Sequence, residues 1–461
     1  MGLSEHYFGD VEAIDEGRNY PSYFDLTYVL PESFSVGALN NKKKYIIVGR
    51  KGSGKTAMQF HLSKQLAKNG YLSHFFSFHN DLKPSDYNSA AQTQKIDVLK
   101  LENSRNIFLN YDFREVWGRT ILLKIAETLV ESGFESSFTK FCLSERSKLS
   151  NLFDGILRSA NLKVSAEMAG ISAELGLDLS KLEKNEISLS QFNEVARNLL
   201  LKHHDLHRLY VFVDELVFSK LDARDDEVRV RAAMVRDIFR STRTLNNFFV
   251  QKDLDFHIIC AVRPEIRDLI NDLDSEIGKL FDGKSVELAW DISDGNDSLL
   301  FRLLKQKVIH SKEGRVLDFD KIFPEELTFN NRPVSIEEFI KTNTWARPRD
   351  IVQFLNSIAD KSPNADIIGE DQIKRSLNEY GRRSFSEIVE EISVKHGALI
   401  ASKLRASVNR RDYRDFDSFS HLVLSNFADF DRDSLLVDLF NFGVIGNYDD
   451  SFRSRRYLRC P

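Results

Sequence analysis

A short segment near the start of the chain combines glycines, a lysine and a hydroxyl in a fixed order. Residues 49–56 match the pattern G-x-x-x-x-G-K-[ST], in which glycines let backbone N–H groups face a phosphate beside a helix N-terminus. The lysine of such a loop, here Lys55, contacts the β- and γ-phosphates, and the hydroxyl of Thr56 is a ligand of Mg²⁺. The alternative is a glycine-rich turn without a ligand. The expected phosphate-binding loop comprises Gly49, Arg50, Lys51, Gly52, Ser53, Gly54, Lys55 and Thr56.

Two adjacent carboxylates end an apolar run further along the chain. Asp214 and Glu215 follow residues 209–213, a run typical of a buried strand, and ligands of open α/β sheets bind at the carboxyl ends of the strands. We expect Asp214 to hold Mg²⁺, directly or through water, and Glu215 to accept a proton from an attacking water. The alternative is a strand that ends in two solvated acids. The adjacent glutamate favours hydrolysis of ATP over phosphoryl transfer to a metabolite.

Three arginines stand where they could contact phosphates. Arg263 follows the apolar run 256–262, and we expect it to act as a catalytic sensor of the γ-phosphate or at a subunit contact, unless it only pairs with Glu265 or Asp268. Arg347 and Arg349 flank a proline that opens a helix. Either could reach the phosphates and couple the position of its domain to hydrolysis. Helix capping and surface pairing with Asp350 are the alternative for these two.

A fourth group of arginines lies on one predicted helix face. Arg236, Arg240 and Arg243 precede the run that ends before Arg263, and one of them could be donated to the site of a neighbouring molecule. The pattern favours a solvated helix face instead.

Short β-branched or aromatic runs alternate with helical stretches from about residue 42 to 290, which predicts a parallel sheet flanked by helices. The order of strands is that of an additional-strand, catalytic-glutamate NTPase, so the predicted fold class is an α/β P-loop NTPase core. Five runs are predicted as strands: 44–48, 71–78, 209–213, 256–262 and 285–290.

The chain divides into three predicted domains. Residues 1–290 form the ATPase core, with a helical insertion at about 135–200 because the loop and Asp214 are further apart than such a core needs. Residues 291–383 have helical periodicity and predict a helical lid. Residues 384–461 end in a helix, a glycine turn and a hairpin, which indicates a winged-helix-like domain.

The composition limits the other classes of function. A chain of 461 residues that is 42% apolar and 29% charged is long enough for two or three buried cores. Three cysteines, Cys142, Cys260 and Cys460, lack the spacing of a disulfide framework or a zinc site, and Cys260 lies in an apolar run that predicts a buried residue.

The sequence predicts no membrane attachment. No stretch approaches the roughly 18 consecutive apolar residues that cross a bilayer, and the first residues have neither a signal-peptide nor a good myristoylation pattern. We therefore expect a soluble, cytoplasmic protein.

Taken together, these motifs resemble a family. The loop 49–56, the strand end 211–215, the end of the run before Arg263, residues 347–350 and the Gly443-Val444-Ile445-Gly446 turn resemble bacterial orphan P-loop ATPases related to AAA+ origin-recognition and STAND ATPases. The resemblance implies an ATPase core, a helical lid and a C-terminal winged helix. Such proteins are often encoded in defence islands, which implies an antiviral sensor that self-associates and controls a separate effector protein.

The sequence also departs from this family. The sensor position holds Arg263, where AAA+ proteins usually have Asn or Thr, and no arginine finger is recognisable. The usual ring assembly of AAA+ proteins therefore does not follow from the resemblance.

The C-terminal region contains two arginine clusters that could neutralise the phosphates of double-stranded DNA. Residues 381–461 nevertheless hold 13 Lys and Arg against 12 Asp and Glu, and the net charge of the whole chain is −5. DNA contact and protein contact therefore both stay open, as do a DNA-remodelling ATPase and a weakly hydrolysing scaffold. The clusters are Arg405, Arg410, Arg411 and Arg414, and Arg453, Arg455, Arg456 and Arg459.

Overall fold

A computed structural model gives the architecture of the chain. It describes residues 2–31, 36–78, 112–144, 161–163, 186–202, 208–216, 225–290, 298–324, 326–329, 332–397, 399–407, 416–422, 424–441, 444–445, 447–449 and 456–458.

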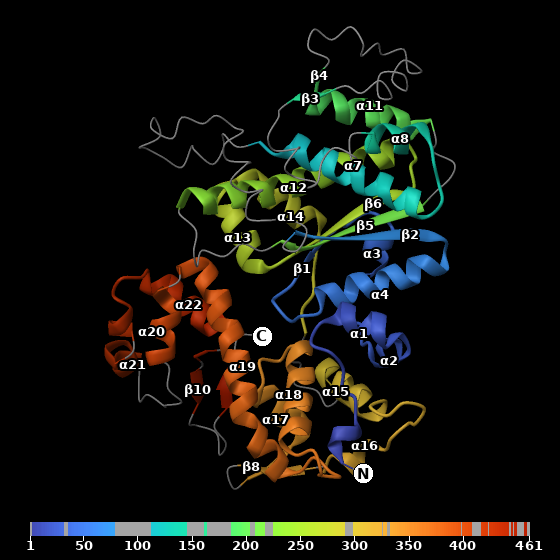
Figure 1. The fold of residues 1–461 in the computed structure, drawn as a ribbon. Helices are drawn as coiled ribbons and strands as arrows, with labels where there is room; N and C mark the ends of the chain where they lie inside the picture. Colours follow the sequence, from blue (N-terminus) through green and yellow to red (C-terminus); the bar gives the residue numbers. More distant parts are fainter. Residues whose placement is uncertain are drawn as a thin grey trace.

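A parallel five-stranded sheet forms the centre of the first half of the chain (Figure 1). Its spatial order is β2-β5-β6-β1-β7, and every neighbouring pair is parallel. All five predicted strands are present, so the predicted α/β class with a parallel sheet is confirmed. The strands are β1 (Ile46–Val48), β2 (Tyr71–Ser77), β5 (Arg208–Leu216), β6 (Phe256–Val262) and β7 (Ser285–Glu287).

The register of the sheet places the ends of four strands at one edge. Val48 pairs with Val262, and Ser77 pairs with Asp214. Because all strands run in the same direction, the residues that follow them meet at this edge. Strand β6 lies between β1 and β5, so the carboxylates after β5 are one strand away from the loop that follows β1.

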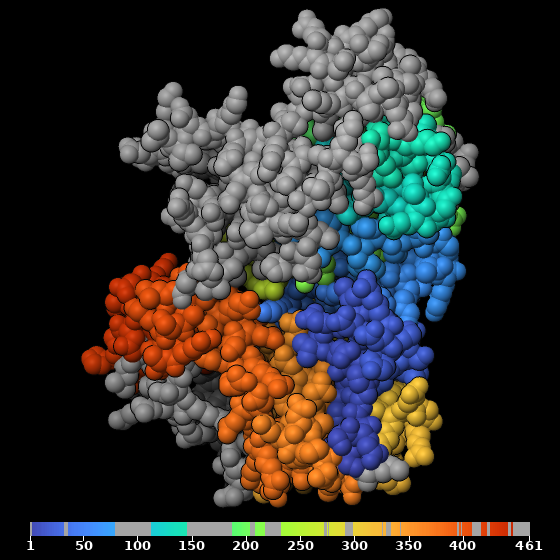
Figure 2. All heavy atoms as spheres, in the orientation of Figure 1, coloured from blue at the N-terminus to red at the C-terminus, as the bar shows by residue number. Residues whose placement is uncertain are grey.

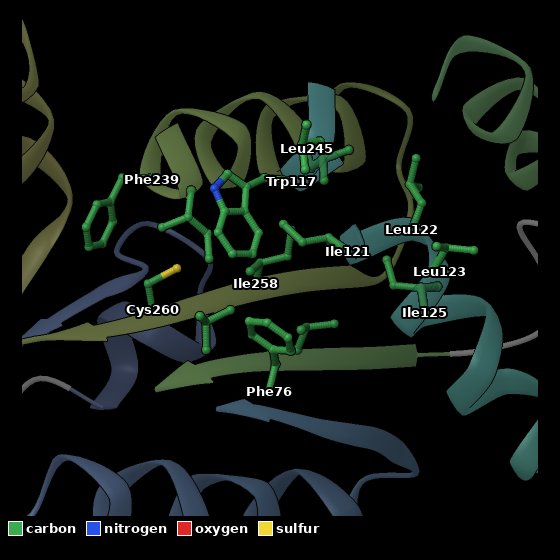
Figure 3. Close-up of a cluster of buried hydrophobic side chains, with 14 of the residues drawn as sticks. Phe76, Trp117, Ile121, Leu122, Leu123, Ile125, Phe239, Leu245, Ile258 and Cys260 are labelled. Carbon is green, nitrogen blue, oxygen red and sulfur yellow. The ribbon is translucent and has the colours of Figure 1, made fainter. Parts of the chain in front are cut away.

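Helices cover both faces of the sheet (Figure 1). One face packs against α4, whose Met58, Leu62 and Leu66 are buried at the predicted spacing. The other face packs against α7 and α12 around Trp117, which donates to the Met234 carbonyl at 2.8 Å, and Cys260 is buried there as expected (Figure 3). These helices are α3 (Val36–Asn40), α4 (Lys55–Lys68), α7 (Arg114–Glu131), α12 (Asp225–Gln251), α13 (Pro264–Leu273) and α14 (Ser275–Lys284).

The predicted insertion at about 135–200 is described in part. Helices α8 (Ser137–Leu143) and α11 (Leu189–Leu201) bury Phe141 and Phe192 against α7, and the two rings stack at 5.0 Å. Strands β3 (Asn161–Lys163) and β4 (Glu186–Ser188) form an antiparallel pair. Residues 145–160 and 164–185 of the insertion lie outside the described residues.

A second hydrophobic cluster forms the lid, which we define as α15 to α18 with the first half of α19. Leu3, Phe8 and Val29 belong to the same cluster, so the N-terminal segment packs against the lid (Figure 2). The segment also contacts α4, where Tyr28 stacks on His61. The elements are η1 (Leu3–Glu5), α1 (Ala13–Asn19), α2 (Pro21–Thr27), α15 (Leu299–Ile309), α16 (Phe319–Ile322), β8 (Glu326–Phe329), β9 (Arg332–Ser335), α17 (Ile336–Asn343), α18 (Pro348–Lys361) and α19 (Glu370–His396).

The last part of the chain is built on the second half of α19, so the predicted boundary at residue 383 lies inside a helix. Ile388 and Ile392 of α19 form a separate cluster with Leu404, Phe427 and Leu435. Helices and a two-stranded antiparallel hairpin follow, in the predicted order. They are α20 (Leu399–Ser407), α21 (Phe416–Leu422), η6 (Leu424–Phe427), α22 (Arg432–Asn441), β10 (Asn447–Asp449) and β11 (Arg456–Leu458). We call α20 to β11 the C-terminal unit.

Within the described residues, no helix is both long enough and apolar enough to span a bilayer.

Candidate nucleotide-binding site

A cavity of about 250 Å³ opens at the carboxyl edge of the sheet. It is enclosed by three parts of the chain: the loop 51–56 with the strand ends, the N-terminal segment, and the lid. Asp214, Glu215 and Arg263 line it from the sheet, and Arg349 lines it from the lid. The sequence-predicted residues Lys51 to Thr56 therefore share one cavity with four of the predicted acidic and basic side chains.

The backbone of the loop has the conformation that glycine allows. Gly52 and Gly54 have φ angles of 76° and 89°, a region that other residues rarely adopt. A Cβ atom at Gly52 would lie 3.0 Å from the Cβ of Arg349. Gly54 precedes Lys55, the first residue of α4, so the N–H groups of the first helical turn point toward the cavity end of the loop.

Lys55 is anchored by the loop itself. Its ammonium group donates to the carbonyls of Gly49 at 2.7 Å and Arg50 at 2.9 Å. Burial, together with the positive charge of Arg263, lowers the pKa of Lys55 to about 8. A phosphate group would add negative charge beside this partly buried cation.

Thr56 and Asp214 meet across the site. The Thr56 hydroxyl donates to a carboxylate oxygen of Asp214 at 2.5 Å, and Asp214 also accepts from the Glu215 N–H at 2.7 Å. A hydroxyl beside a carboxylate fits the oxygen ligands that Mg²⁺ takes from nucleotide-binding proteins, which usually supply one or two side chains and leave the rest to phosphates and water. Among the described residues there is no group of three or more His, Cys, Asp or Glu that could hold a metal alone.

Glu215 projects from an irregularity in β5. The pairing of β5 with β6 shifts between Val213 and Leu216, and Glu215 has a φ of 56°. The shift lets Asp214 stay buried while the Glu215 side chain is exposed to the cavity. The Ser77 hydroxyl at the end of β2 donates to the Glu215 carboxylate. Sequence reasoning missed Ser77, although its place at the end of a predicted strand is a signal for it.

Arg263 contacts both the cavity and a carboxylate. It lines the cavity, and it lies 3.8 Å from Glu265 in the first turn of α13. The side chain therefore lies beside the loop 49–56 and has a carboxylate partner in the first turn of α13, and its role as a sensor stays a prediction.

Arg347 and Arg349 take different places. Arg347 is buried and pairs with Asp350 at 2.9 Å and Glu391 at 3.0 Å, and it donates to the Lys51 carbonyl at 3.0 Å. It does not line the cavity, so it holds the loop in place from behind. Arg349 lines the cavity and lies 3.6 Å from both Glu12 and Glu387. The surface pairing with Asp350 that the sequence left open is, for Arg347, a buried pairing.

Three carboxylates of α19, Glu387, Glu390 and Glu391, complete the loop's surroundings, and sequence reasoning missed all of them. Glu390 pairs with Lys51 at 2.6 Å. Burial and the negative charge of Glu265 raise the pKa of Glu391 to about 7. We refer to Glu387, Glu390 and Glu391 as the α19 carboxylates. No local pattern marks them, because the helix lies more than 330 residues from the loop in sequence.

The N-terminal segment supplies the far wall of the cavity. Glu16 of α1 and Lys307 of α15 form a buried pair at 2.5 Å, and both line the cavity together with Tyr28 and Val29. This pair joins the N-terminal segment to the lid. The sequence gives no motif for this wall.

The predicted solvated face of α12 is wrong for Arg236. This side chain is buried and binds the neighbouring Asp237 at 2.7 Å. Arg240 also pairs with Asp237, and with Asp274. Only Arg243 is exposed. Apolar residues pack around this side of the helix. A guanidinium buried among them needs a counter-ion, and Asp237 supplies it.

Most of the C-terminal arginines lie outside the residues that the structure describes. Arg405 is exposed on α20. Arg410, Arg411, Arg414, Arg453, Arg455 and Arg459 lie outside the described residues, and for Arg456 only the backbone is described.

Comparison with known families finds one similarity. Residues 298–389 match the family described as FunZ-associated C-terminal helical domain. The match begins at the residue before α15 and ends inside α19, so it covers the lid and stops near the start of the C-terminal unit's cluster. A comparison with curated proteins finds no match. The predicted relation of the whole chain to P-loop ATPases stays a prediction.

Proposed function

We propose that this protein binds Mg-ATP in the cavity at the edge of the sheet and hydrolyses it. The observation that carries the proposal is the meeting of Lys55 and Thr56 with Asp214 and Glu215, from positions about 160 residues apart, around one cavity. The strand β6 between β1 and β5 supports the additional-strand class of P-loop NTPase.

Each residue has a distinct role in this reaction. The loop N–H groups and Lys55 bind the β- and γ-phosphates, and Arg263 and Arg349 stabilise charge that develops on the γ-phosphate. Glu215 orients a water molecule and accepts its proton, and Ser77 holds the carboxylate of Glu215 in place. Thr56 and Asp214 would hold Mg²⁺, which neutralises phosphate charge when it is bound.

The wider role follows from the resemblance and the architecture. We propose a cytoplasmic regulatory or sensor ATPase of AAA+ type that self-associates and controls a separate effector protein, in the setting of antiviral defence. The helices and hairpin of the C-terminal unit support a winged-helix domain that contacts this partner. Binding of double-stranded DNA by the same unit, as in a remodelling ATPase, is the competing function.

The test is steady-state ATP hydrolysis by the purified protein, with and without duplex DNA, at low and physiological salt. Lys55→Ala should weaken ATP binding, and Glu215→Gln should keep binding but lower turnover by about 10²-fold or more, as expected for loss of a general base. Glu131→Gln, an exposed residue at the end of α7, is the matched control and should behave as the wild type.

The outcomes separate the candidates. Normal hydrolysis by Glu215→Gln would refute the catalytic assignment, and slow turnover that this change leaves unaltered would support a nucleotide-dependent scaffold. Stimulation by DNA that weakens with salt would favour the remodelling function. Turnover that ignores DNA would favour a protein partner.

A further inference from the structure

Cations that line the cavity are already bound to carboxylates outside it. Lys51 lines the cavity, and its ammonium group lies 2.6 Å from Glu390. Arg349 lines the cavity, and its guanidinium lies 3.6 Å from Glu387 and 3.6 Å from Glu12, which itself lines the cavity. Neither Glu390 nor Glu387 lines the cavity. Each of these cations therefore stands between the place of a bound phosphate and a carboxylate on the other side.

The carboxylates come from one face of one helix. Residues 387, 390 and 391 are spaced by three and four positions, so their side chains share a face of α19. The third of them, Glu391, is buried and accepts from Arg347, which in turn donates to the Lys51 carbonyl. The α19 carboxylates thus attach this helix to both the side chain and the backbone of the phosphate-binding loop.

The same stretch of α19 carries the C-terminal unit. Ile388, Val389 and Ile392 alternate with the α19 carboxylates and are buried in the cluster that includes Leu404, Phe427 and Leu435. In Figure 1, α19 runs from the lid to the C-terminal unit, with α22 beside its end. Contacts that fix this stretch of α19 to the loop therefore also fix the C-terminal unit to the ATPase core.

A nucleotide phosphate changes the charge balance of these contacts. It brings negative charge to the cavity side of Lys51, Arg263 and Arg349, where it attracts the cations away from their carboxylates. The buried Glu391 faces Glu265, and Arg263 is one of the cations that offset their repulsion. When Arg263 turns to a phosphate, this repulsion is less screened, which weakens the fit of α19 against α13.

On this basis, and assuming the proposed ATP binding, we propose that the α19 carboxylates are internal counter-ions that compete with ATP for Lys51 and Arg349. Triphosphate binding loosens the attachment of α19 to the loop, and the C-terminal unit is released from its docked position. The α19 carboxylates are positioning residues that set ATP affinity and the state of the C-terminal unit. They do not touch the nucleotide.

The first test is a double-mutant cycle on ATP affinity, measured by calorimetry with the non-hydrolysing Glu215→Gln background. Glu390→Gln should tighten ATP binding about 2- to 5-fold, the size expected for removing one partly exposed ion pair. Lys51→Met should weaken binding and abolish the effect of Glu390→Gln. The control is Glu379→Gln on the same helix, where the carboxylate pairs only with Arg382 and Arg383 of α19 in the contacts described, and binding should not change.

The second test follows backbone hydrogen exchange of the full chain with and without Mg-ATP in the same background. Residues 384–396 of α19 and helix α22 should exchange faster with ATP, and Glu390→Gln should show part of this increase without nucleotide. Helix α8 should not change, because it packs on α7 and contributes no residue to the cavity.

The results distinguish this inference from the proposed function. Equal ATP affinity of Glu390→Gln and its parent, or unchanged exchange in residues 384–396, overturns the competition while ATP binding stands. An effect of Glu390→Gln that persists with Lys51→Met also overturns it, because the effect would then not pass through Lys51. Failure of the wild type to bind ATP overturns both.

Discussion

The two sides of the cavity are built in different ways. On the sheet side, Lys55, Thr56 and Asp214 lie within a few residues of buried strands, and the register of the sheet fixes where they meet. On the lid side, Arg347 and Arg349 are held by carboxylates from α18, α19 and the N-terminal segment. The backbone of the sheet therefore positions the side chains on one side of the cavity, and buried ion pairs position those on the other side.

This difference predicts different consequences of substitution. A change on the sheet side removes a group from the proposed hydrolysis of ATP but leaves the strand that carries this group in place. A change on the lid side leaves other buried charges without partners, which costs folding free energy. Turnover should therefore respond most to the first kind of change and stability most to the second.

The largest expected effect is on the lid side. Arg347→Met leaves Asp350 and Glu391 buried without their main counter-ion, and breaking such a pair costs about 3–5 kcal/mol. We expect a loss of this size in the unfolding free energy of the lid, measured by urea denaturation followed by circular dichroism. Arg382→Met, at an exposed ion pair of α19, should leave the unfolding free energy nearly unchanged. Equal stability of the two variants would remove the contrast between the sides.

A smaller effect is expected on the sheet side. Ser77→Ala removes the hydroxyl that donates to Glu215, and a hydrogen bond to a charged group is worth about 1.5–3 kcal/mol when it is buried. Because Glu215 is exposed, we expect turnover to fall by about tenfold, with ATP affinity and thermal stability unchanged. Ser73→Ala, on the same face of β2 but within the strand, should leave turnover unchanged. A fall in stability without a fall in turnover would contradict the assignment.

A third effect, again on the lid side, depends on pH. The pKa of Glu391 is raised to about 7 from 4.5, because the residue is buried and faces Glu265, against the attraction of Arg347, Arg263 and Lys51. The folded protein therefore binds more protons than the unfolded chain between these values, so stability from this group is present at low pH and is lost as the pH rises through about 7.

Glu391→Gln removes this dependence. We compare the unfolding free energy of the variant with that of the wild type at each pH. This difference should be about 1–3 kcal/mol more favourable to the variant at pH 8.5 than at pH 5. Urea midpoints at the two pH values measure the gain. A constant difference at both pH values would show that Glu391 keeps its proton state across this range.

Much of the sheet side could be predicted from the sequence. A continuous apolar run ending in Asp214-Glu215, and a glycine loop between an apolar run and an amphipathic helix, are local patterns, and a parallel sheet leaves few ways to arrange them. The five predicted strands and the shared cavity follow from such patterns. Ser77 was missed only because a single serine after a strand carries little information.

The lid side could not be predicted in the same way. The α19 carboxylates lie on a helix with ordinary surface composition, and Glu16 and Lys307 are far apart in sequence. These side chains become buried and paired only when the helices pack, so their contribution depends on partners that are distant in sequence. The error at Arg236 has the same origin: its partner Asp237 is the next residue, but nothing in the pattern shows that this turn of α12 is buried.

Helix α19 also connects the lid to the C-terminal unit over a long distance. Its 27 residues form one unbroken helix with Gly397 at its C-cap, and at 1.5 Å per residue it is about 40 Å long. A tilt of about 10° at its lid end would carry the other end through about 7 Å, by the same geometry. The α19 carboxylates lie in the second half of this length, so a movement of the helix beside the loop reaches the C-terminal unit with little change in size. The length of α19, more than the strength of any one ion pair, sets the distance over which a movement of this helix is transmitted.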